Sequence, residues 1–62
     1  MNDTNPRILR LPEVIKLTGL SRSTIYSLIS KGDFPQQIKL TKRSSGWNSN
    51  DVQNWINSRL DH

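Results

Sequence analysis

Residues 11–32 read LPEVIKLTGLSRSTIYSLISKG, two short amphipathic segments separated by a turn that contains glycine. The first segment, about residues 12–18, begins with a proline and stops at Gly19, which is typical of a short helix. The second, about residues 22–31, follows Ser21, whose hydroxyl can accept hydrogen bonds from free amides of a first helical turn. Two short helices joined by such a turn indicate a helix-turn-helix.

Apolar residues at helical spacing predict which faces of these helices are buried. Neither segment is long enough to be a stable helix alone, so each needs a partner to pack on. The expected inward residues are Leu11, Val14 and Leu17 in the first helix and Ile25, Leu28 and Ile29 in the second.

The next part of the chain predicts a β-hairpin. Residues 37–41 alternate apolar and polar side chains, as a half-buried strand does. Residues 42–46 are a polar turn with glycine near its end, and Trp47 lies on a return strand. We therefore expect a hairpin over residues 37–48 with a basic tip, and we expect Phe34, in the loop before it, to close one edge of the core.

A third helix is expected after the hairpin, with Asn48 as its cap and Asp51 completing a variant of the capping box. The predicted fold is mainly α with a small β-hairpin: a winged helix-turn-helix of three helices plus a wing. We expect a single winged helix-turn-helix domain over residues 8–62 after a flexible polar arm over residues 1–7. The inward residues of the third helix are Val52, Trp55, Ile56 and Leu60.

The composition excludes several classes of function. The chain has 62 residues, no cysteine and a single histidine, His62, so disulfides, thiolate metal sites and histidine-based catalysis lack their essential residues. No apolar run exceeds two residues, which argues against a membrane span or a secretory signal. We expect a cytoplasmic, nucleoid-associated module that is not an enzyme and holds no cofactor, metal or small-molecule ligand.

The positive charge is concentrated in the middle of the chain. Residues 22–43 carry an excess of +4, equal to the net charge of the whole protein. Such an excess attracts polyanions such as nucleic acid, although a solvated face that keeps a small protein soluble gives the same count. The cations in this segment are Arg22, Lys31, Lys39, Lys42 and Arg43.

The first turn of the second helix has the chemistry of a base-reading surface. Arg22 can give a bidentate pair to guanine, and Ser23 and Thr24 can bond to base edges or to a phosphate. Tyr26 can reach a phosphate through its hydroxyl. Each also has a structural alternative: the serine and threonine can serve only as caps, the arginine as a solvated cation, and the tyrosine as half-buried packing.

The chain resembles the AlpA family of small phage and prophage regulators, which have a MerR-like winged helix related to the excisionases. The resemblance covers about residues 8–60. It is carried by Leu11-Pro12-Glu13-Val14, Thr18-Gly19-Leu20-Ser21-Arg22-Ser23-Thr24-Ile25-Tyr26, Gly32-x-Phe34-Pro35, Lys39-Leu40, Gly46-Trp47 and Val52-x-x-Trp55-Ile56.

The resemblance implies DNA binding beside a mobile genetic element, with a reading helix over residues 21–29 and a wing over residues 38–47. The chain departs from the family at Ser27, often a large basic or aromatic residue, and in its wing, where one basic pair precedes two serines. The candidate DNA-binding residues are therefore Ser21, Arg22, Ser23, Thr24, Tyr26, Ser27, Lys31, Lys39, Lys42 and Arg43.

Three functional hypotheses follow. The first is a sequence-specific regulator that binds double-stranded DNA in a prophage or integrated element and acts on integrase expression, with further copies on adjacent sites. The second is an excisionase that bends attachment-site DNA. The third, from another class, is a small inhibitor that docks on a regulator or on integrase through an exposed apolar patch, for which Ile8, Leu9 and Ile15 are the candidates.

Overall fold

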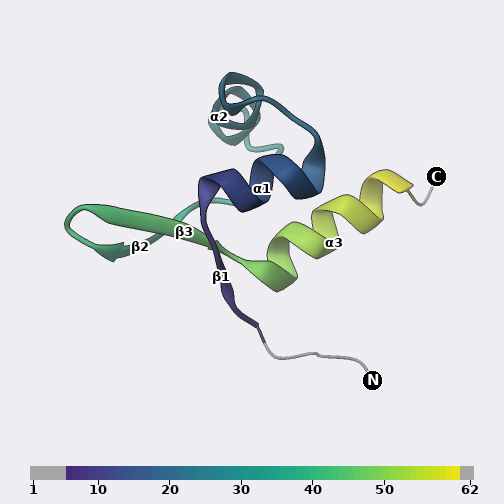
Figure 1. Ribbon diagram of the computed structural model, residues 1–62. Coiled ribbons are helices and arrows are strands. Elements are labelled where there is room, and N and C mark those ends of the chain that lie inside the picture. The colour runs from purple at the N-terminus through teal and green to yellow at the C-terminus, as the bar shows by residue number, and fades with distance from the viewer. Residues whose placement is uncertain (1–5, 61–62) are drawn as a thin grey trace.

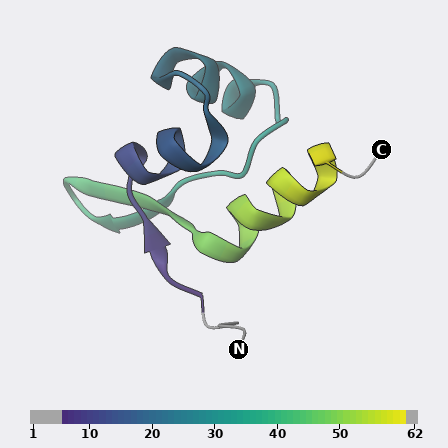
Figure 2. The same cartoon turned by 45° about the vertical axis from the view of Figure 1, so that its right-hand side comes forward.

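The computed structural model describes residues 6–60 and contains three helices and a small antiparallel sheet (Figure 1). The prediction of a winged helix-turn-helix agrees with this arrangement. The hairpin of β2 and β3 extends away from the helices in both ribbon views (Figures 1 and 2). The elements are β1 (Ile8–Leu9), α1 (Leu11–Thr18), α2 (Arg22–Ser30), β2 (Ile38–Thr41), β3 (Ser44–Asn48) and α3 (Ser49–Leu60).

Helix α1 begins one residue before the predicted start. Leu11 is already helical although a proline follows it, and Arg10 is the extended residue that precedes the helix. The reason is the side chain of Glu13, which reaches back and accepts a hydrogen bond from the Arg10 amide at 2.9 Å. Gly19 ends the helix at φ 75°, a left-handed conformation that favours glycine.

Side-chain caps fix the starts of the other two helices as predicted. The Ser21 hydroxyl accepts from the Thr24 amide at 3.2 Å and begins α2. The Asn48 side chain accepts from the Asn50 amide at 2.8 Å and begins α3. The expected return bond from Asp51 to Asn48 is absent from the hydrogen bonds within residues 6–60.

The sheet has three strands rather than the two of the predicted hairpin. Strand β1 pairs antiparallel with β3, placing Ile8 opposite Asn48 and Leu9 opposite Trp47, so the strand order is β1-β3-β2. The Arg7 carbonyl continues the connection by accepting from the Ser49 amide at 2.8 Å. Arg7 is therefore held in place, although it was expected in the flexible arm; residues 1–5 of that arm lie outside the described residues.

Gly46 lies within β3 and not in the turn, where the sequence had placed it. The turn between the strands is the shorter pair Lys42 and Arg43. A Cβ atom on Gly46 would lie 2.5 Å from Cγ2 of Ile8 and 2.9 Å from the carbonyl oxygen of Leu9. The glycine is therefore required because β1, its neighbour in the sheet, lies too close to leave room for a side chain.

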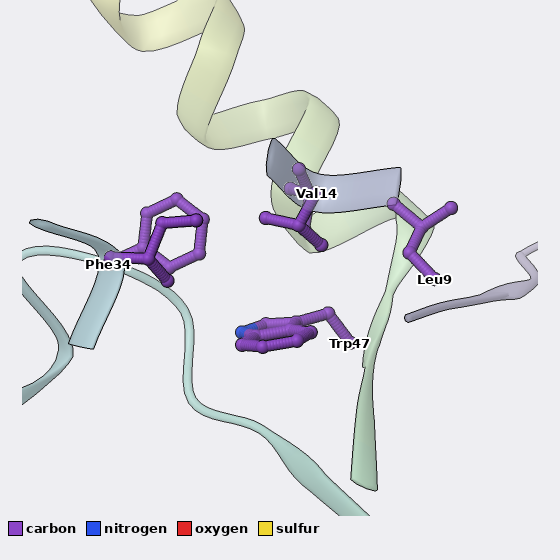
Figure 3. Close-up of a cluster of buried hydrophobic side chains, with 6 residues drawn as sticks. Leu9, Val14, Phe34 and Trp47 are labelled. Atoms are coloured by element: carbon purple, nitrogen blue, oxygen red, sulfur yellow. The ribbon is translucent and has the colours of Figure 1, made fainter. Parts of the chain in front are cut away.

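The core is centred on Trp47, which has no exposed surface. Its indole lies among Val14 of α1, Phe34 of the loop before β2, and Leu9 of β1 (Figure 3). The indole N–H donates to the Pro35 carbonyl at 3.0 Å. The predicted role of Phe34 in closing the core is confirmed, and its ring meets Trp55 of α3 edge-on, with centroids 4.9 Å apart.

Two predicted core residues are exposed. Leu17 is 50% exposed and Leu60 is 76% exposed. In α1 the buried stripe instead uses Ile15 together with Leu11 and Val14, because these three residues follow the spacing of one helix face. In α3 the contact stripe ends at Ile56, before the helix extends beyond the core.

No helix within residues 6–60 combines the length and the apolar character that crossing a bilayer requires.

Candidate nucleic-acid interface

Helix α2 presents a polar face because its apolar residues are used for packing. Ile25 is fully buried, and Leu28 and Ile29 pack against the core beside it. The opposite face carries Ser23 and Ser27, both exposed. These small side chains would let the helix backbone come close to the base edges in the major groove of DNA, which is wide enough to admit an α-helix.

The first turn of α2 also presents a cation held against an aromatic ring. The Arg22 guanidinium carbon lies 5.8 Å from the centre of the Tyr26 ring. Tyr26 is 37% exposed, and its hydroxyl accepts a hydrogen bond from the side-chain amide of Gln37 at 3.2 Å. This contact joins α2 to the segment that leads into β2.

The hairpin carries three exposed cations: Lys39 on β2, and Lys42 and Arg43 in the turn. The turn is closed by the Arg43 amide, which donates to the Thr41 hydroxyl at 3.1 Å. Strand β2 is an edge strand, since β3 alone pairs with it. The cations therefore lie on a projecting structure that is accessible to a large anionic partner.

None of these cations is neutralised by a carboxylate within residues 6–60. The ion pair found among these residues joins Arg7, which directly precedes β1, to Glu13 of α1 at 3.5 Å. Unpaired surface cations keep their full attraction for phosphate, because no internal ion pair must be broken first. We call the exposed residues of α2's first two turns and the hairpin cations the α2–hairpin surface; it comprises Arg22, Ser23, Thr24, Tyr26, Ser27, Lys39, Lys42 and Arg43.

Two further candidate DNA-binding residues, Lys31 and Ser21, are not included in the α2–hairpin surface. Lys31 follows the last residue of α2, about 14 Å along the helix axis from Arg22 at 1.5 Å per residue. The Ser21 hydroxyl is already engaged, because it accepts from the Thr24 amide and donates to the Thr24 hydroxyl at 3.0 Å. Ser21 therefore acts as the cap of α2, as the sequence predicts.

Within the described residues, the one carboxyl group with a shifted pKa lies outside the α2–hairpin surface. The pKa of Glu13 lies below its ordinary value of 4.5, first because its carboxylate accepts from the Arg10 amide, and also because Arg7 is close. A shallow hollow of about 260 Å³ lies beside it, lined by Arg7, Glu13, Lys16 and Leu17. None of the candidate DNA-binding residues lines this hollow.

The apolar patch proposed for a protein partner is not formed by the predicted residues. Leu9 is 1% exposed, and Ile15 packs against the core. Ile8 remains exposed, and like Leu40 of β2 it lies close to Gly46 on the sheet face opposite Trp47.

The family comparison agrees with the architecture. A sequence model described as "Prophage CP4-57 regulatory protein (AlpA)" matches residues 7–60. The chain belongs to this family. The resemblance inferred from the residue motifs is therefore confirmed, and the match includes every element from β1 to α3.

Two relatives show how far the similarity extends. The uncharacterized protein ORF88 of Enterobacteria phage P4 is 49% identical over 57 residues, which cover 92% of this chain and 65% of that protein. The DNA-binding transcriptional activator AlpA of Escherichia coli strain K12 is 36% identical over 64 residues, covering 94% of this chain and 91% of the activator. The chain thus spans about two-thirds of the phage protein's length and nearly all of the activator's.

Sequence reasoning did not single out Gln37, whose side chain contacts the candidate residue Tyr26. It had been assigned to the start of a strand as the first polar residue of an alternating pattern, and that pattern gives no sign of a contact with α2. Its bond to Tyr26 joins residues 11 positions apart in the chain, so it depends on how the loop after α2 returns toward that helix.

Proposed function

We propose that the protein is a regulator that binds double-stranded DNA through the α2–hairpin surface and acts in a prophage or integrated mobile element. The observation that carries the proposal is the pairing of a polar reading helix with a projecting hairpin, both bearing unpaired cations. Support comes also from the family, and from the relative in Escherichia coli whose name describes it as a DNA-binding transcriptional activator.

In this proposal the two parts of the surface have different tasks. The N-terminal turn of α2 enters the major groove, where Arg22 pairs with a base and the hydroxyls of Ser23 and Thr24 bond to base edges. Tyr26 donates to a phosphate. The hairpin binds the backbone or the adjacent minor groove, which fixes orientation without reading sequence.

One copy offers a small surface, since single DNA-binding modules bury roughly 600–1,000 Å² of protein on DNA. Tight binding therefore calls for further copies on adjacent sites or for a partner protein such as integrase. We propose the promoter of an integrase gene as the target of the regulator.

The test is to mix the purified protein with sheared DNA from its own host at low salt and to sequence the retained fragments. The proposal expects enrichment of one locus. A promoter there supports the regulator, whereas an attachment site supports the alternative of an excisionase that bends DNA. Absence of retention, or retention without preference for any locus, overturns sequence-specific DNA binding.

Salt dependence tests the electrostatic part separately. If Arg22, Lys31, Lys39, Lys42 and Arg43 all neutralise phosphates, the logarithm of the binding constant falls against that of salt concentration with a slope of about −4.5. If Lys31 at the far end of α2 makes no contact, the slope is about −3.6. A slope near zero would contradict the assignment of these cations to phosphates.

A further inference from the structure

The bond between Gln37 and Tyr26 connects α2 to the loop that leads into the hairpin. Three hydrogen bonds between side chains are found within residues 6–60. This one joins α2 to another segment, whereas the other two lie at the start of α2 and within α3. Gln37 and Tyr26 are both exposed, so the bond is not required to satisfy a buried polar atom.

The direction of the bond determines what the tyrosine can do. A phenol hydroxyl has one proton to donate and can also accept. Here the Gln37 amide donates to the Tyr26 oxygen, so the hydroxyl proton is left for another acceptor. The oxygens of a phosphate diester are acceptors only, and this matches the role that Tyr26 retains.

The same bond limits the movement of the tyrosine ring, on which Arg22 rests. Holding a side chain in its binding conformation reduces the entropy lost when the complex forms. One exposed amide thus acts on two DNA-binding side chains, and it does so from outside the recognition helix.

We propose that Gln37 is a positioning residue of the DNA interface, which holds Tyr26 as a hydrogen-bond donor to one backbone phosphate and keeps its ring under Arg22. This inference rests on the proposed function. It assigns a role to a residue that lies neither on the recognition helix nor on the hairpin strands.

The test compares Gln37→Met, which keeps the length of the side chain and removes its donor, with Tyr26→Phe and with the double variant. The neighbour Gln36 is exposed, and its side chain forms no hydrogen bond with any other residue in the range 6–60, so Gln36→Met is the matched control. Affinities are measured on the duplex recovered from host DNA, and thermal melting verifies that each variant is folded.

Each single variant is expected to weaken binding about fivefold, the effect of one hydrogen bond. The double variant should be no weaker than Tyr26→Phe, because the two residues serve one contact. Gln36→Met should bind as the wild type does. Unchanged affinity of folded Gln37→Met, or losses that multiply in the double variant, would overturn the inference.

A scan of single methylphosphonate substitutions in the duplex adds a readout that a general structural role would not change. One position should weaken the wild type but neither Tyr26→Phe nor Gln37→Met. If every position affects Gln37→Met and the wild type alike, the positioning role is wrong.

Reversing the bond gives a second test. A carboxylate at residue 37 can only accept, so in Gln37→Glu it would accept the hydrogen bond that the Tyr26 hydroxyl donates, whereas Gln36→Glu adds the same charge without that effect. Gln37→Glu should bind more weakly than Gln36→Glu, and equal losses would contradict the proposal. If the wild-type protein retains no DNA, the proposed function itself is overturned. If the wild type binds DNA and the Gln37 variants bind equally well, only this inference is overturned.

Discussion

Strands β2 and β3 are paired in one hairpin, yet their side chains serve different purposes. Strand β3 contains two buried residues, Gly46 and Trp47, whereas all four residues of β2 are exposed, including Ile38 and Leu40. The difference follows from position: β3 is paired on both sides and faces the helices, whereas β2 is at the edge. An alternating pattern alone therefore did not predict burial, and the apolar residues of β2 lie on the sheet face away from Trp47.

This comparison separates folding from recognition. Substitutions on β3 should change the stability of the protein, and those on the α2–hairpin surface should change DNA binding with little effect on stability.

The largest effect is expected for Trp47→Ala. Truncating a buried tryptophan costs about 3–5 kcal/mol, which is comparable to the whole stability of roughly 3–9 kcal/mol for a chain of this length. Circular dichroism should show a protein that is largely unfolded at 25 °C. Lys39→Ala on β2 is the control and should stay within about 0.5 kcal/mol of the wild type; a cooperative transition of Trp47→Ala near the wild-type midpoint would contradict the account.

Gly46→Ala should destabilise the fold by about 1–3 kcal/mol, since its Cβ would overlap β1 and force the strand to move. Urea denaturation measures the change. Ser45→Ala, one residue earlier on the same strand, adds no atom and should be close to neutral. A neutral Gly46→Ala would mean that β1 does not need to lie so close to β3.

Arg22→Ala should leave the melting temperature nearly unchanged and weaken binding to the specific duplex by about 1–3 kcal/mol, with relaxed preference at one base pair. Arg22→Lys keeps the charge but cannot form the bidentate pair, so it should recover non-specific affinity and not that preference. Competition binding with single-base variants of the site checks both. Equal losses on all sequences would show that Arg22 contacts only phosphate.

Lys42→Ala should weaken binding to specific and non-specific duplexes by similar factors and reduce the salt slope by about 0.9. Lys16→Ala removes the same charge from α1, outside the α2–hairpin surface, and should leave the slope unchanged. Filter binding at several salt concentrations distinguishes them. A selective loss on the specific site would show that Lys42 reads bases.

Glu13→Gln should have the smallest effect, and it should depend on pH. The pKa of Glu13 is lowered in the folded protein, so its ionised carboxylate stabilises the fold at pH values above the ordinary pKa of 4.5. This contribution disappears as the pH falls through the lower pKa of the folded state. The melting temperature of Glu13→Gln at pH 7 should therefore be lower than that of the wild type. The difference should vanish in acid, and a constant difference would contradict the assignment.

The sequence predicted those features that depend on local rules. Ser21 and Asn48 are caps, and the apolar face of α2 that contains Ile25 packs into the core as expected. In contrast, β1 has two residues and pairs with a strand about forty residues away, so no periodicity could reveal it. Gly46 looked like a turn glycine for the same reason, because the strand that pairs beside it was not predicted.

The candidate site shows the same division. Its cations and the polar first turn of α2 were visible in charge and spacing, but the contact of Tyr26 with Gln37 depends on the path of the loop between α2 and β2. The exposure of Leu17 likewise depends on which face of α1 meets the sheet, and that is set by tertiary packing.

The most direct test of the account is an NMR titration of the ¹⁵N-labelled protein with the duplex recovered from host DNA, followed residue by residue. The account predicts that amide shifts concentrate in the first two turns of α2, at Gln37 and in the hairpin turn, while α1 and the C-terminal half of α3 change little. Shifts confined to the hollow beside Leu17 or to α3, or no response to DNA at low salt, would contradict it.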